Sequence, residues 1–414
     1  MAVLRPFKAI RPVPELVAQV AALPYDVMNS TEAREMVKDN PRSFLHVDRA
    51  EIDLGPGADP YSTQVYEKAR QNLNNMLENG TLAKDQTANL YIYRLTMNCR
   101  TQTGIVGCVS IDDYLHNVIK KHEHTRPEKE QDRINHVDYC DANTGPIFLT
   151  YKGEDEIDRI INTWTRKSPL YDFVAEDGIS HTVWSIDDRS AIVSMCGLFA
   201  AIPSFYIADG HHRASSAVKV GEKRRERHPD YKGDEEFNYF LAVLFRDKDL
   251  RIMDYNRVVT DLNGLTPQEY LSKLAENFEI LAAPENTPIK PDSKHTFGMY
   301  FADRWYELKA KEGIFDPLDP VDRLDVSILQ NSLLSPILGI TDPRTDQRID
   351  FVGGIRGLEE LEKRVKAGMA VAFAVYPTSI EDLMDIADAG EVMPPKSTWF
   401  EPKLRSGIFI HQLS

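Results

Sequence analysis

At 414 residues the chain is long enough for two or three domains, each with its own hydrophobic core. Hydrophobic residues make up 42% of it and charged residues 27%, which is typical of a folded globular protein and excludes a largely disordered chain. The 64 acidic residues outnumber the 49 basic ones, and the formal net charge is −15. This balance disfavours a nucleic-acid-binding surface, which needs a concentrated basic footprint, but not a small anionic ligand held by a few arginines.

No stretch of the sequence predicts a membrane segment or a secretion signal. The amino terminus has no long apolar core, and no apolar run is long enough to span a bilayer. The four cysteines are scattered, so neither a disulfide framework nor a cysteine-ligated zinc site is expected. We therefore expect a cytoplasmic protein that binds neither membranes nor nucleic acids.

The first part of the chain mixes predicted strands and helices. Strands are expected at residues 4–10, 43–47, 90–97, 103–111, 147–151, 181–186, 205–209 and 239–245. Helices are expected from residue 30 or 31 to before Pro41, and at residues 61–78, 157–164, 191–201 and 214–221, with another starting near Pro127. Residues 239–245 are apolar without a break, as in a strand covered on both faces in the middle of an α/β sheet. Residues 251–259 are expected to pair beside that strand as a hairpin.

A boundary near residues 263–264, Asn-Gly, is expected to begin a smaller second unit. Its first helix is predicted by the capping box Thr-Pro-Gln-Glu at 266–269. Two strands flank Asp303, and further strands are expected at residues 349–352, 369–376 and 407–413. Helices are expected within residues 321–334, at 358–365 and after the cap at 378–381. No internal repeat is present.

The strongest functional motif is residues 205–214, where an apolar strand ends in Asp-Gly-His-His-Arg and a helix-compatible segment follows. A strand, a glycine turn and a helix together point backbone N–H groups and the positive helix end at an anion. Asp209, at the carboxyl end of the strand, could hold Mg²⁺, while the N–H groups after Gly210 and the Arg213 guanidinium could hold a phosphate. Either His211 or His212 could act as an acid, a base or a hydrogen-bond donor. In the alternative interpretation, Asp209 caps the helix and the histidines form a solvated first turn.

A second polar stretch, residues 120–133, has a similar layout. His-Glu-His at 122–124 precedes a helix expected to start near residue 127. Glu123 and His124 are candidate general bases, and Arg126 and Arg133 are candidate phosphate clamps. The alternative is a solvated helix laced with charges.

The two stretches could instead supply the ligands of a Zn²⁺ or Fe²⁺ site, from His122, His124, His211, His212 and Asp209. Against this, adjacent histidines diverge, and no His-Glu-x-x-His spacing is present. A metal-dependent hydrolase therefore stands as an alternative function.

Two further turns could line a pocket. Leu-Pro-Tyr-Asp-Val at residues 23–27 places the Asp26 carboxylate on a turn stiffened by proline. Pro-Pro-Lys-Ser-Thr-Trp at residues 394–399 places Lys396 beside two hydroxyl groups. Each is also typical of a packed loop with a buried aromatic residue.

The turn at residues 209–213, the turn at residues 23–27, the tract at residues 122–133 and the tail at residues 393–400 together resemble the family known as domain of unknown function 1015, or DUF1015, along essentially the whole chain. The Asp-Gly-His-His-Arg turn also resembles that of archaeal free serine kinases and, more loosely, the nucleotide-binding turn of the ParB and sulfiredoxin superfamily. For residues 209–213 this resemblance implies binding of Mg²⁺ and a nucleotide, ATP or ADP, and phosphoryl transfer to a small hydroxyl such as that of serine. The resemblance does not locate the catalytic glutamate of the kinases, for which Glu123 and Asp26 are substitutes. The sulfiredoxin turn carries a cysteine that is absent here, which disfavours that chemistry.

We therefore predict a mixed α/β protein with a ParB- and serine-kinase-like catalytic unit over residues 1–262. A smaller α+β unit over residues 263–414 is expected to line the pocket with its tail, through Lys396. The leading hypothesis is a Mg²⁺- and nucleotide-dependent phosphotransferase acting on serine, phosphoserine or a similar small metabolite. The alternatives are the metal-dependent hydrolase and a nucleotide-binding regulatory protein. A homodimer is compatible with the sequence.

Overall fold

The computed structural model describes residues 2–55 and 57–414, which form two compact units. The first unit comprises Met1–Leu250 together with Pro402–Ser414, and the second comprises Arg251–Glu401. Both units combine sheets with helices, so the fold is mixed α/β, as predicted. The predicted division at residue 262 differs from the observed contacts, because the strand before it belongs to the second unit and the chain returns to the first unit at Pro402.

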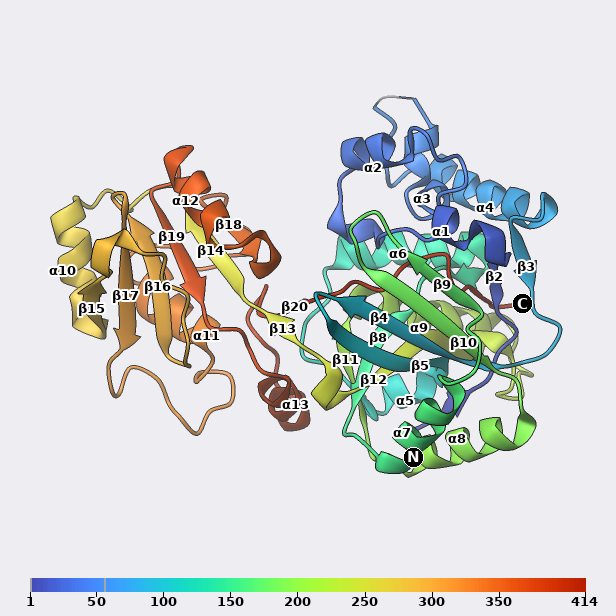
Figure 1. Ribbon diagram of the computed structural model, residues 1–414. Helices are drawn as coiled ribbons and strands as arrows, with labels where there is room; N and C mark the ends of the chain where they lie inside the picture. Colours follow the sequence, from blue (N-terminus) through green and yellow to red (C-terminus); the bar gives the residue numbers. More distant parts are fainter. Residues whose placement is uncertain (1, 56) are drawn as a thin grey trace. The chain divides into compact units, whose positions relative to one another are not determined.

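The first unit is built on a nine-stranded mixed sheet with the order β6-β11-β8-β12-β5-β4-β10-β9, and β1 pairs with β5 (Figure 1). Its strands are β1 (Leu4–Arg5), β4 (Leu90–Met97), β5 (Arg100–Ser110), β6 (Ile119–Lys120), β8 (Ile147–Tyr151), β9 (Tyr171–Val174), β10 (Ser180–Ile186), β11 (Phe205–Asp209) and β12 (Tyr239–Arg246). The pairs β11–β6 and β12–β8 are parallel, and β12 is buried on both faces, as its unbroken apolar run predicts.

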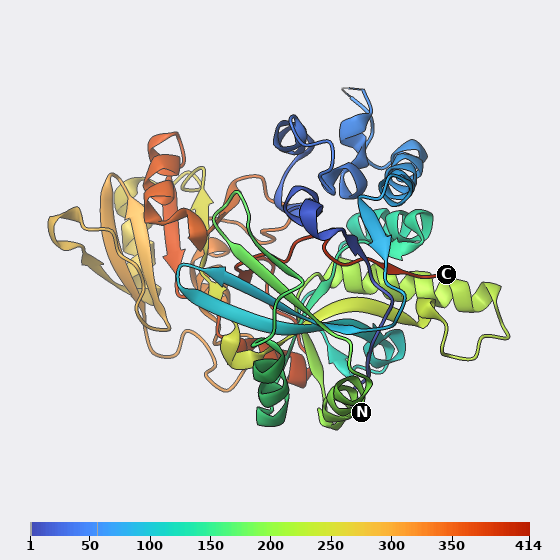
Figure 2. The same ribbon diagram turned by 45° about the vertical axis from the view of Figure 1, so that its right-hand side comes forward.

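Helices cover this sheet and bury its apolar side chains. They are α5 (Ile111–Leu115), α6 (Pro127–Cys140), α7 (Asp155–Trp164), α8 (Arg189–Ala201) and α9 (His211–Arg227). Apolar residues of α7, α8 and α9 form one core with those of the strands. Figures 1 and 2 show α5, α7 and α8 on one side of the sheet, while α6 packs against α9. The predicted helix start near residue 127 is confirmed.

A second layer of the first unit consists of helices formed by residues 17–78 (Figures 1 and 2). They are α1 (Val17–Val20), α2 (Ser30–Val37), α3 (Leu45–Asp48) and α4 (Thr63–Glu78). Two small antiparallel strand pairs accompany them: β2 (Ile10–Pro12) pairs with β3 (Leu82–Lys84), and β7 (Ala142–Asn143) pairs with β21 (His411–Gln412). The strand predicted at residues 43–47 is wrong, because that segment turns into α3. An apolar run of this length carries too little periodicity to separate helix from strand.

The last residues of the chain run through this layer beside β2 (Figures 1 and 2). Ile410 bridges to Ile10, and Ser406 bridges to Ala22. Apolar side chains of the helical layer pack around Ile410 in a core of their own. The carboxyl-terminal segment is therefore part of the first unit's interior.

The second unit has an antiparallel six-stranded sheet with the order β15-β17-β16-β19-β14-β18. Its strands are β14 (Tyr255–Val259), β15 (Phe278–Ala282), β16 (Thr296–Phe301), β17 (Arg304–Ala310), β18 (Ile349–Gly353) and β19 (Val371–Val375), with β13 (Ile252–Met253) and β20 (Trp399–Phe400) paired separately. Its helices are α10 (Pro267–Asn277), α11 (Asp325–Leu329), the π-helical η7 (Gln330–Leu334), α12 (Leu358–Lys366) and α13 (Ile380–Ala389). The capping box at Thr266 and Glu269 is confirmed.

The hairpin predicted between residues 251–259 and 239–245 is wrong. Instead, β14 pairs with β18 and β19 of the second unit, and β12 pairs with β5 and β8 of the first. Two apolar strands that follow each other closely in sequence favour a hairpin, but the burial of each strand by its own sheet decides the pairing. Single turns of 3₁₀-helix complete the structure: η1 (Pro14–Leu16), η2 (Tyr25–Val27), η3 (Ala50–Asp53), η4 (Glu236–Asn238), η5 (Asp247–Asp249), η6 (Pro284–Asn286) and η8 (Gly354–Arg356).

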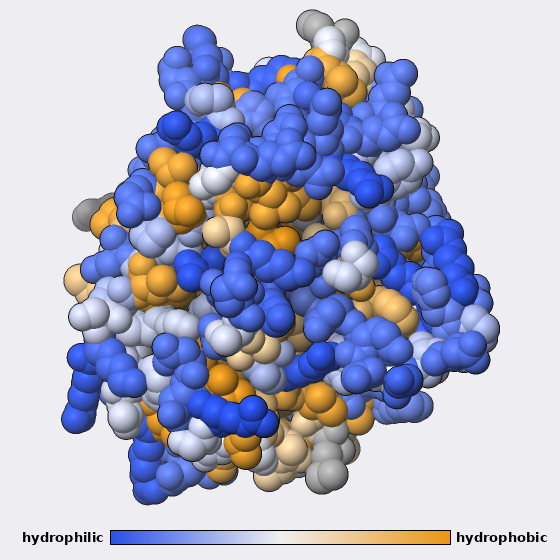
Figure 3. All heavy atoms as spheres, turned by 90° about the vertical axis from the view of Figure 1, so that its right-hand side faces the viewer, coloured by the Kyte–Doolittle hydropathy of each residue, from blue (hydrophilic) through white to orange (hydrophobic). Residues whose placement is uncertain are grey.

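The surface in Figure 3 is mainly hydrophilic, and apolar side chains show in separate patches between the polar ones. Scattered exposed apolar residues are normal on a folded protein. Among the described residues, no helix has the length and apolar character that crossing a membrane requires.

Candidate functional site

Parallel pairing brings the two polar stretches of the first unit together. Ile119 pairs with Phe205 and Lys120 with Tyr206, so β6 and β11 end at the same edge of the sheet. The segment after β6, residues 121–126, therefore lies beside the turn at residues 209–213. The pairing of β11 with β8 is irregular just before that turn, and such bulges redirect the side chains that follow them.

Gly210 makes the turn between β11 and α9. Its φ of 93° and ψ of 31° are left-handed, a conformation that glycine adopts without steric cost. Gly210 is the N-cap of α9, and its carbonyl accepts the first helical hydrogen bond, from Ala214 N at 2.9 Å. The N–H groups of residues 211–213 therefore have no partner within the helix, at its positive end. The interpretation of Asp209 as the N-cap is wrong.

The Asp209 carboxylate closes the turn and is held by a lysine from the end of the chain. Its Oδ1 accepts a hydrogen bond from Gly210 N at 2.8 Å, and Lys403 Nζ lies 3.1 Å from its Oδ2. Burial raises the pKa of Asp209, but the positive charges of Lys403 and Arg213 outweigh this effect and lower it to about 2. Asp209 is therefore ionised at neutral pH, with two cationic groups facing it.

His122, Glu123 and His211 form a cluster beside this turn. The two imidazole rings are 4.4 Å apart between centroids and meet at 88°, and Glu123 Oε2 lies 4.0 Å from His211 Nδ1. Burial lowers the pKa of His122 to about 4 and that of His211 well below its usual value, so both rings are neutral at pH 7. Neither ring nitrogen of His122, nor Nε2 of His211, has a hydrogen-bond partner among the described residues. A buried polar group without a partner costs about 1–3 kcal/mol.

His212 points away from that cluster and ties the two stretches together. Its Nε2 accepts a hydrogen bond from Arg126 N at 3.0 Å. Burial lowers its pKa, while the negative charge of Asp26 opposes this effect, which places the Asp26 turn close to α9. Asp26, His124 and Arg126 are exposed. His211 and His212 thus diverge, as expected for adjacent histidines.

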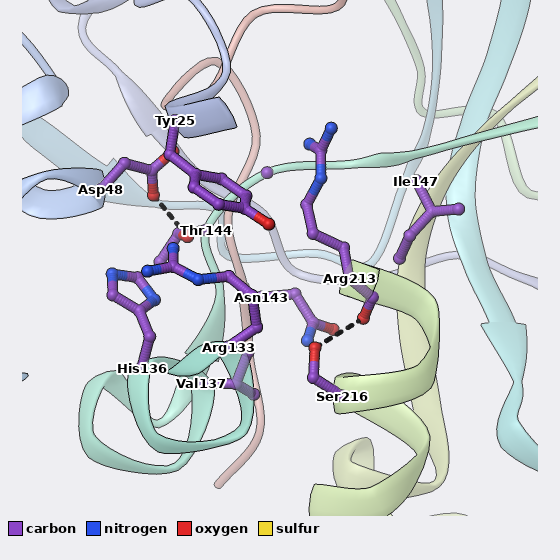
Figure 4. A pocket seen from close by; sticks show the side chains of 11 residues that line it. Tyr25, Asp48, Arg133, His136, Val137, Asn143, Thr144, Ile147, Arg213 and Ser216 are labelled. Carbon is purple, nitrogen blue, oxygen red and sulfur yellow. Dashed lines mark hydrogen bonds between the residues drawn. The ribbon is translucent and has the colours of Figure 1, made fainter. Parts of the chain in front are cut away.

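A cavity of about 20 Å³ lies between the Tyr25 turn, α6 and the start of α9 (Figure 4). Its lining residues are Tyr25, Asp48, Arg133, His136, Val137, Asn143, Thr144, Gly145, Ile147, Arg213 and Ser216. The Arg133 guanidinium stacks 4.0 Å from the centre of the Tyr25 ring and pairs with Asp132 at 2.8 Å. Arg213 donates a hydrogen bond to the Pro146 carbonyl at 3.0 Å. This volume suits one water molecule and is too small for a nucleotide.

A larger cleft of about 300 Å³ adjoins the cavity and shares Tyr25, Asp48, Arg133 and His136 with it. Both signs of charge line the cleft: it also contains Arg49, Glu51, Lys129 and Asp132, with the tyrosines at positions 61 and 66. Its volume is at the lower end of those that bind small molecules in proteins.

Sequence reasoning missed Lys403, the group that pairs with Asp209. The motif recognised in the tail ended at residue 400, and the only available signal was a pair of basic residues, Lys403 and Arg405, after Pro402. Lys396 belongs to the second unit, where its carbonyl accepts a hydrogen bond from Arg257 and its ammonium lies 5.5 Å from the centre of the Tyr255 ring. Its role at the turn stays a prediction.

The family model described as protein of unknown function, DUF1015, matches residues 4–327. The chain belongs to this family. No curated protein matches the sequence.

Among solved structures, a glutamate-to-glutamine variant of free serine kinase in complex with AMP is similar to the chain, with a TM-score of 0.39 and 14% identity over 73% of this chain and 92% of that one. A glutamate-to-alanine variant of the same kinase in complex with ADP has a TM-score of 0.38 and 14% identity, with coverage of 73% and 92%. A conserved hypothetical protein from Pyrococcus furiosus has a TM-score of 0.37 and 14% identity, with coverage of 73% and 94%. These values describe a distant likeness in fold. The proteins compared include the kinase that the Asp-Gly-His-His-Arg turn resembles.

Proposed function

We propose that the first unit binds the phosphates of a nucleotide at the first turn of α9 and transfers a phosphoryl group to a small hydroxyl metabolite. The observation that carries this proposal is the left-handed Gly210 at the N-cap of α9. It leaves three consecutive N–H groups at the positive end of a 17-residue helix, beside the cationic Arg213 and Lys403. Such an arrangement favours an anion with several oxygen atoms.

The side chains of the turn have separate roles in this proposal. The Arg213 guanidinium donates a hydrogen bond to the Pro146 carbonyl, which orients it while its other N–H groups can reach a phosphate. Lys403 is held by Asp209 and can bridge that carboxylate and a phosphate oxygen. The His211 ring is buried, so this residue would contribute its backbone N–H. Positioning and charge neutralisation are the main requirements of phosphoryl transfer.

The donor set at the turn fits Mg²⁺ in part. Mg²⁺ is commonly held by one or two carboxylates together with phosphate oxygens and water, and Asp209 offers one carboxylate. That carboxylate already pairs with Lys403, so the ion and the ammonium would share it. When bound, Mg²⁺ would supply charge neutralisation at the phosphates.

The cleft of about 300 Å³ is our candidate for the acceptor. Its carboxylates and basic groups suit a zwitterionic metabolite such as serine, with the acceptor's charged ends matched by side chains of opposite sign. The exposed Asp26, which follows the cleft-lining Tyr25 in the chain, is the first candidate for orienting the hydroxyl and accepting its proton. The exposed His124 and the partly exposed Glu123 are further candidates outside the lining of the cleft.

The test is direct phosphoryl transfer by the full chain. ATP or ADP with Mg²⁺ is incubated with serine and a panel of small alcohols, and phosphoserine is used for the reverse direction. Asp209→Asn keeps the size of the side chain but removes the charge that holds Lys403, so we expect transfer to fall about 100-fold, the magnitude typical for loss of one preorganised electrostatic group. Asp39→Asn, at an exposed aspartate of the same unit, is the matched control. No transfer to any acceptor, or equal transfer by Asp209→Asn, would contradict the proposal.

A further inference from the structure

We propose that His122, Glu123 and His211 bind one divalent transition-metal ion of the Zn²⁺ or Fe²⁺ class. Each residue offers a ligand atom, and these three atoms all lie within 4.8 Å of one another. The proposal does not depend on nucleotide binding, because it concerns three side chains and not the backbone N–H groups of the turn.

The ligand set is specific in its chemistry. Two imidazoles and one carboxylate bind Zn²⁺ in hydrolytic enzymes and Fe²⁺ in oxygenases, in both cases with further positions open to water or substrate. Mg²⁺ prefers oxygen ligands, so imidazole nitrogens distinguish this site from a nucleotide-linked Mg²⁺ site at Asp209. Donor atoms around a zinc ion lie about 2.0–2.2 Å from it, so the three side chains would have to close in slightly.

A comparison of the buried histidines separates a ligand role from ordinary packing. Five histidines of the described residues are buried: His122, His136, His181, His211 and His411. His181 and His411 have a hydrogen-bond partner at each ring nitrogen, and His136 bonds the Val47 carbonyl. His122, 1% exposed, and His211, 5% exposed, are the two of these with ring nitrogens that are both fully buried and without a partner, and their rings are in contact with each other.

The fold explains why these unpartnered nitrogens come together. His122 follows β6 and His211 follows β11, and the two strands are parallel neighbours, so both residues leave the sheet at the same edge. The Glu123 side chain is 41% exposed, whereas the two rings are buried, and its Oε2 lies 4.0 Å from His211 Nδ1, where it can complete the ligand set. A bound ion would satisfy nitrogens that protein groups leave unpaired, and it would link the segment after β6 to the first residue of α9.

The outer histidines of the same region lie outside this ligand set. His124 is exposed, and Nε2 of His212 accepts a hydrogen bond from Arg126 N. The five-residue set predicted from sequence is thus reduced to His122 and His211, with Glu123 added. This reduction makes His124 a matched control in the same segment.

The experiment measures metal binding by the full chain without nucleotide. Chelator-treated protein is titrated with Zn²⁺ by calorimetry and with Co²⁺ by visible absorption, which reports the ligand geometry. We expect one equivalent to bind, and His122→Gln, His211→Gln and Glu123→Gln to weaken binding by at least about 10-fold, since even losing a group that only orients a ligand costs that much. His124→Gln should bind as the unaltered protein does.

Circular dichroism establishes that each variant is folded, and Glu123→Gln, at a partly exposed residue, keeps the test valid if a buried substitution unfolds the chain. A rise in Tm on adding Zn²⁺, retained by His124→Gln and lost by Glu123→Gln, would support the site. Failure of the unaltered protein to bind a stoichiometric ion would overturn the proposal. So would equal binding by Glu123→Gln and the unaltered protein, or a loss in His124→Gln as large as in the others. None of these results bears on whether the turn binds nucleotide.

Discussion

Replacing Lys403 with methionine should destabilise the first unit by leaving Asp209 without its ion-pair partner. The Lys403 side chain is 13% exposed and that of Asp209 is 32% exposed, and Lys403 Nζ lies 3.1 Å from Asp209 Oδ2, so water compensates the lost charge incompletely. Methionine keeps most of the length and apolar stem of the lysine side chain. The substitution therefore tests the charge more than the packing.

The size of the effect follows from the pKa of Asp209. A carboxyl whose pKa falls from 3.8 to about 2 on folding gains roughly 2 kcal/mol of stability at neutral pH. Since Asp209 is about one-third exposed and Lys403 supplies only part of the shift, we expect a loss of about 1–2 kcal/mol. Because folding lowers the pKa of Asp209, its ionised form stabilises the fold above about pH 4, and this stabilisation is lost as the pH falls toward 2.

Urea unfolding at several pH values between 7 and 3 measures this loss. The cycle of Lys403→Met, Asp209→Asn and the double variant isolates the pair, and we expect a coupling free energy of about 1–2 kcal/mol at pH 7. The coupling should shrink below about pH 4. Lys8→Met, at an exposed lysine of the same unit, should change stability by less than about 0.5 kcal/mol. A coupling near zero at pH 7, or one that grows as the pH falls, would refute the reasoning.

Three further predictions concern the surroundings of the site. Gly210→Ala should lower the free energy of unfolding in urea by about 1–2 kcal/mol, because Gly210 has a left-handed φ of 93°. Gly197→Ala, inside α8 and without a left-handed φ, should raise it by about 0.5–1 kcal/mol. Equal effects of the two substitutions would contradict this prediction. Arg133→Met removes the ion-pair partner of the buried Asp132, which keeps its hydrogen bond from the Tyr66 hydroxyl, and should cost about 3 kcal/mol by the same assay. A loss below about 1 kcal/mol would be contrary evidence. Burial lowers the pKa of His181 to about 3, so the folded state keeps this ring neutral, and the free energy of unfolding decreases as the pH falls below about 6.5. His181→Gln should remove about 1.4 kcal/mol per pH unit from this pH dependence between pH 6 and 4. An unchanged pH dependence would exclude this role.

The position of the turn could be predicted because its determinants are local. The apolar run, the glycine and the helix-compatible segment after it specify a strand, a left-handed turn and a helix without reference to distant residues. The predicted end of that helix at Gly221 was wrong, since α9 continues to Arg227. A Cβ at position 221 would lie 2.6 Å from the Phe237 carbonyl oxygen, so glycine is required there for close packing and does not end the helix.

The partners of the site depend on pairings distant in sequence, which local patterns do not contain. His122 and His211 meet because β6 pairs in parallel with β11, and the long segment from residue 121 to 204 separates these two strands in the sequence. Lys403 reaches Asp209 from 194 residues away because the end of the chain returns to the first unit. Composition and spacing do not show that these residues meet. The sequence therefore identified candidate functional residues, but not which of them lie together in the folded protein.

The central claim is that the first turn of α9 receives the phosphates of a nucleotide, and hydrogen exchange tests it most directly. The full chain is compared with and without ATP or ADP in the presence of Mg²⁺, and exchange is followed by mass spectrometry in peptides covering residues 209–214. We predict saturable binding accompanied by slower exchange at the N–H groups of residues 211–213, and loss of both in Asp209→Asn. Binding that leaves exchange in this turn unchanged, or no binding of either nucleotide, would contradict the account.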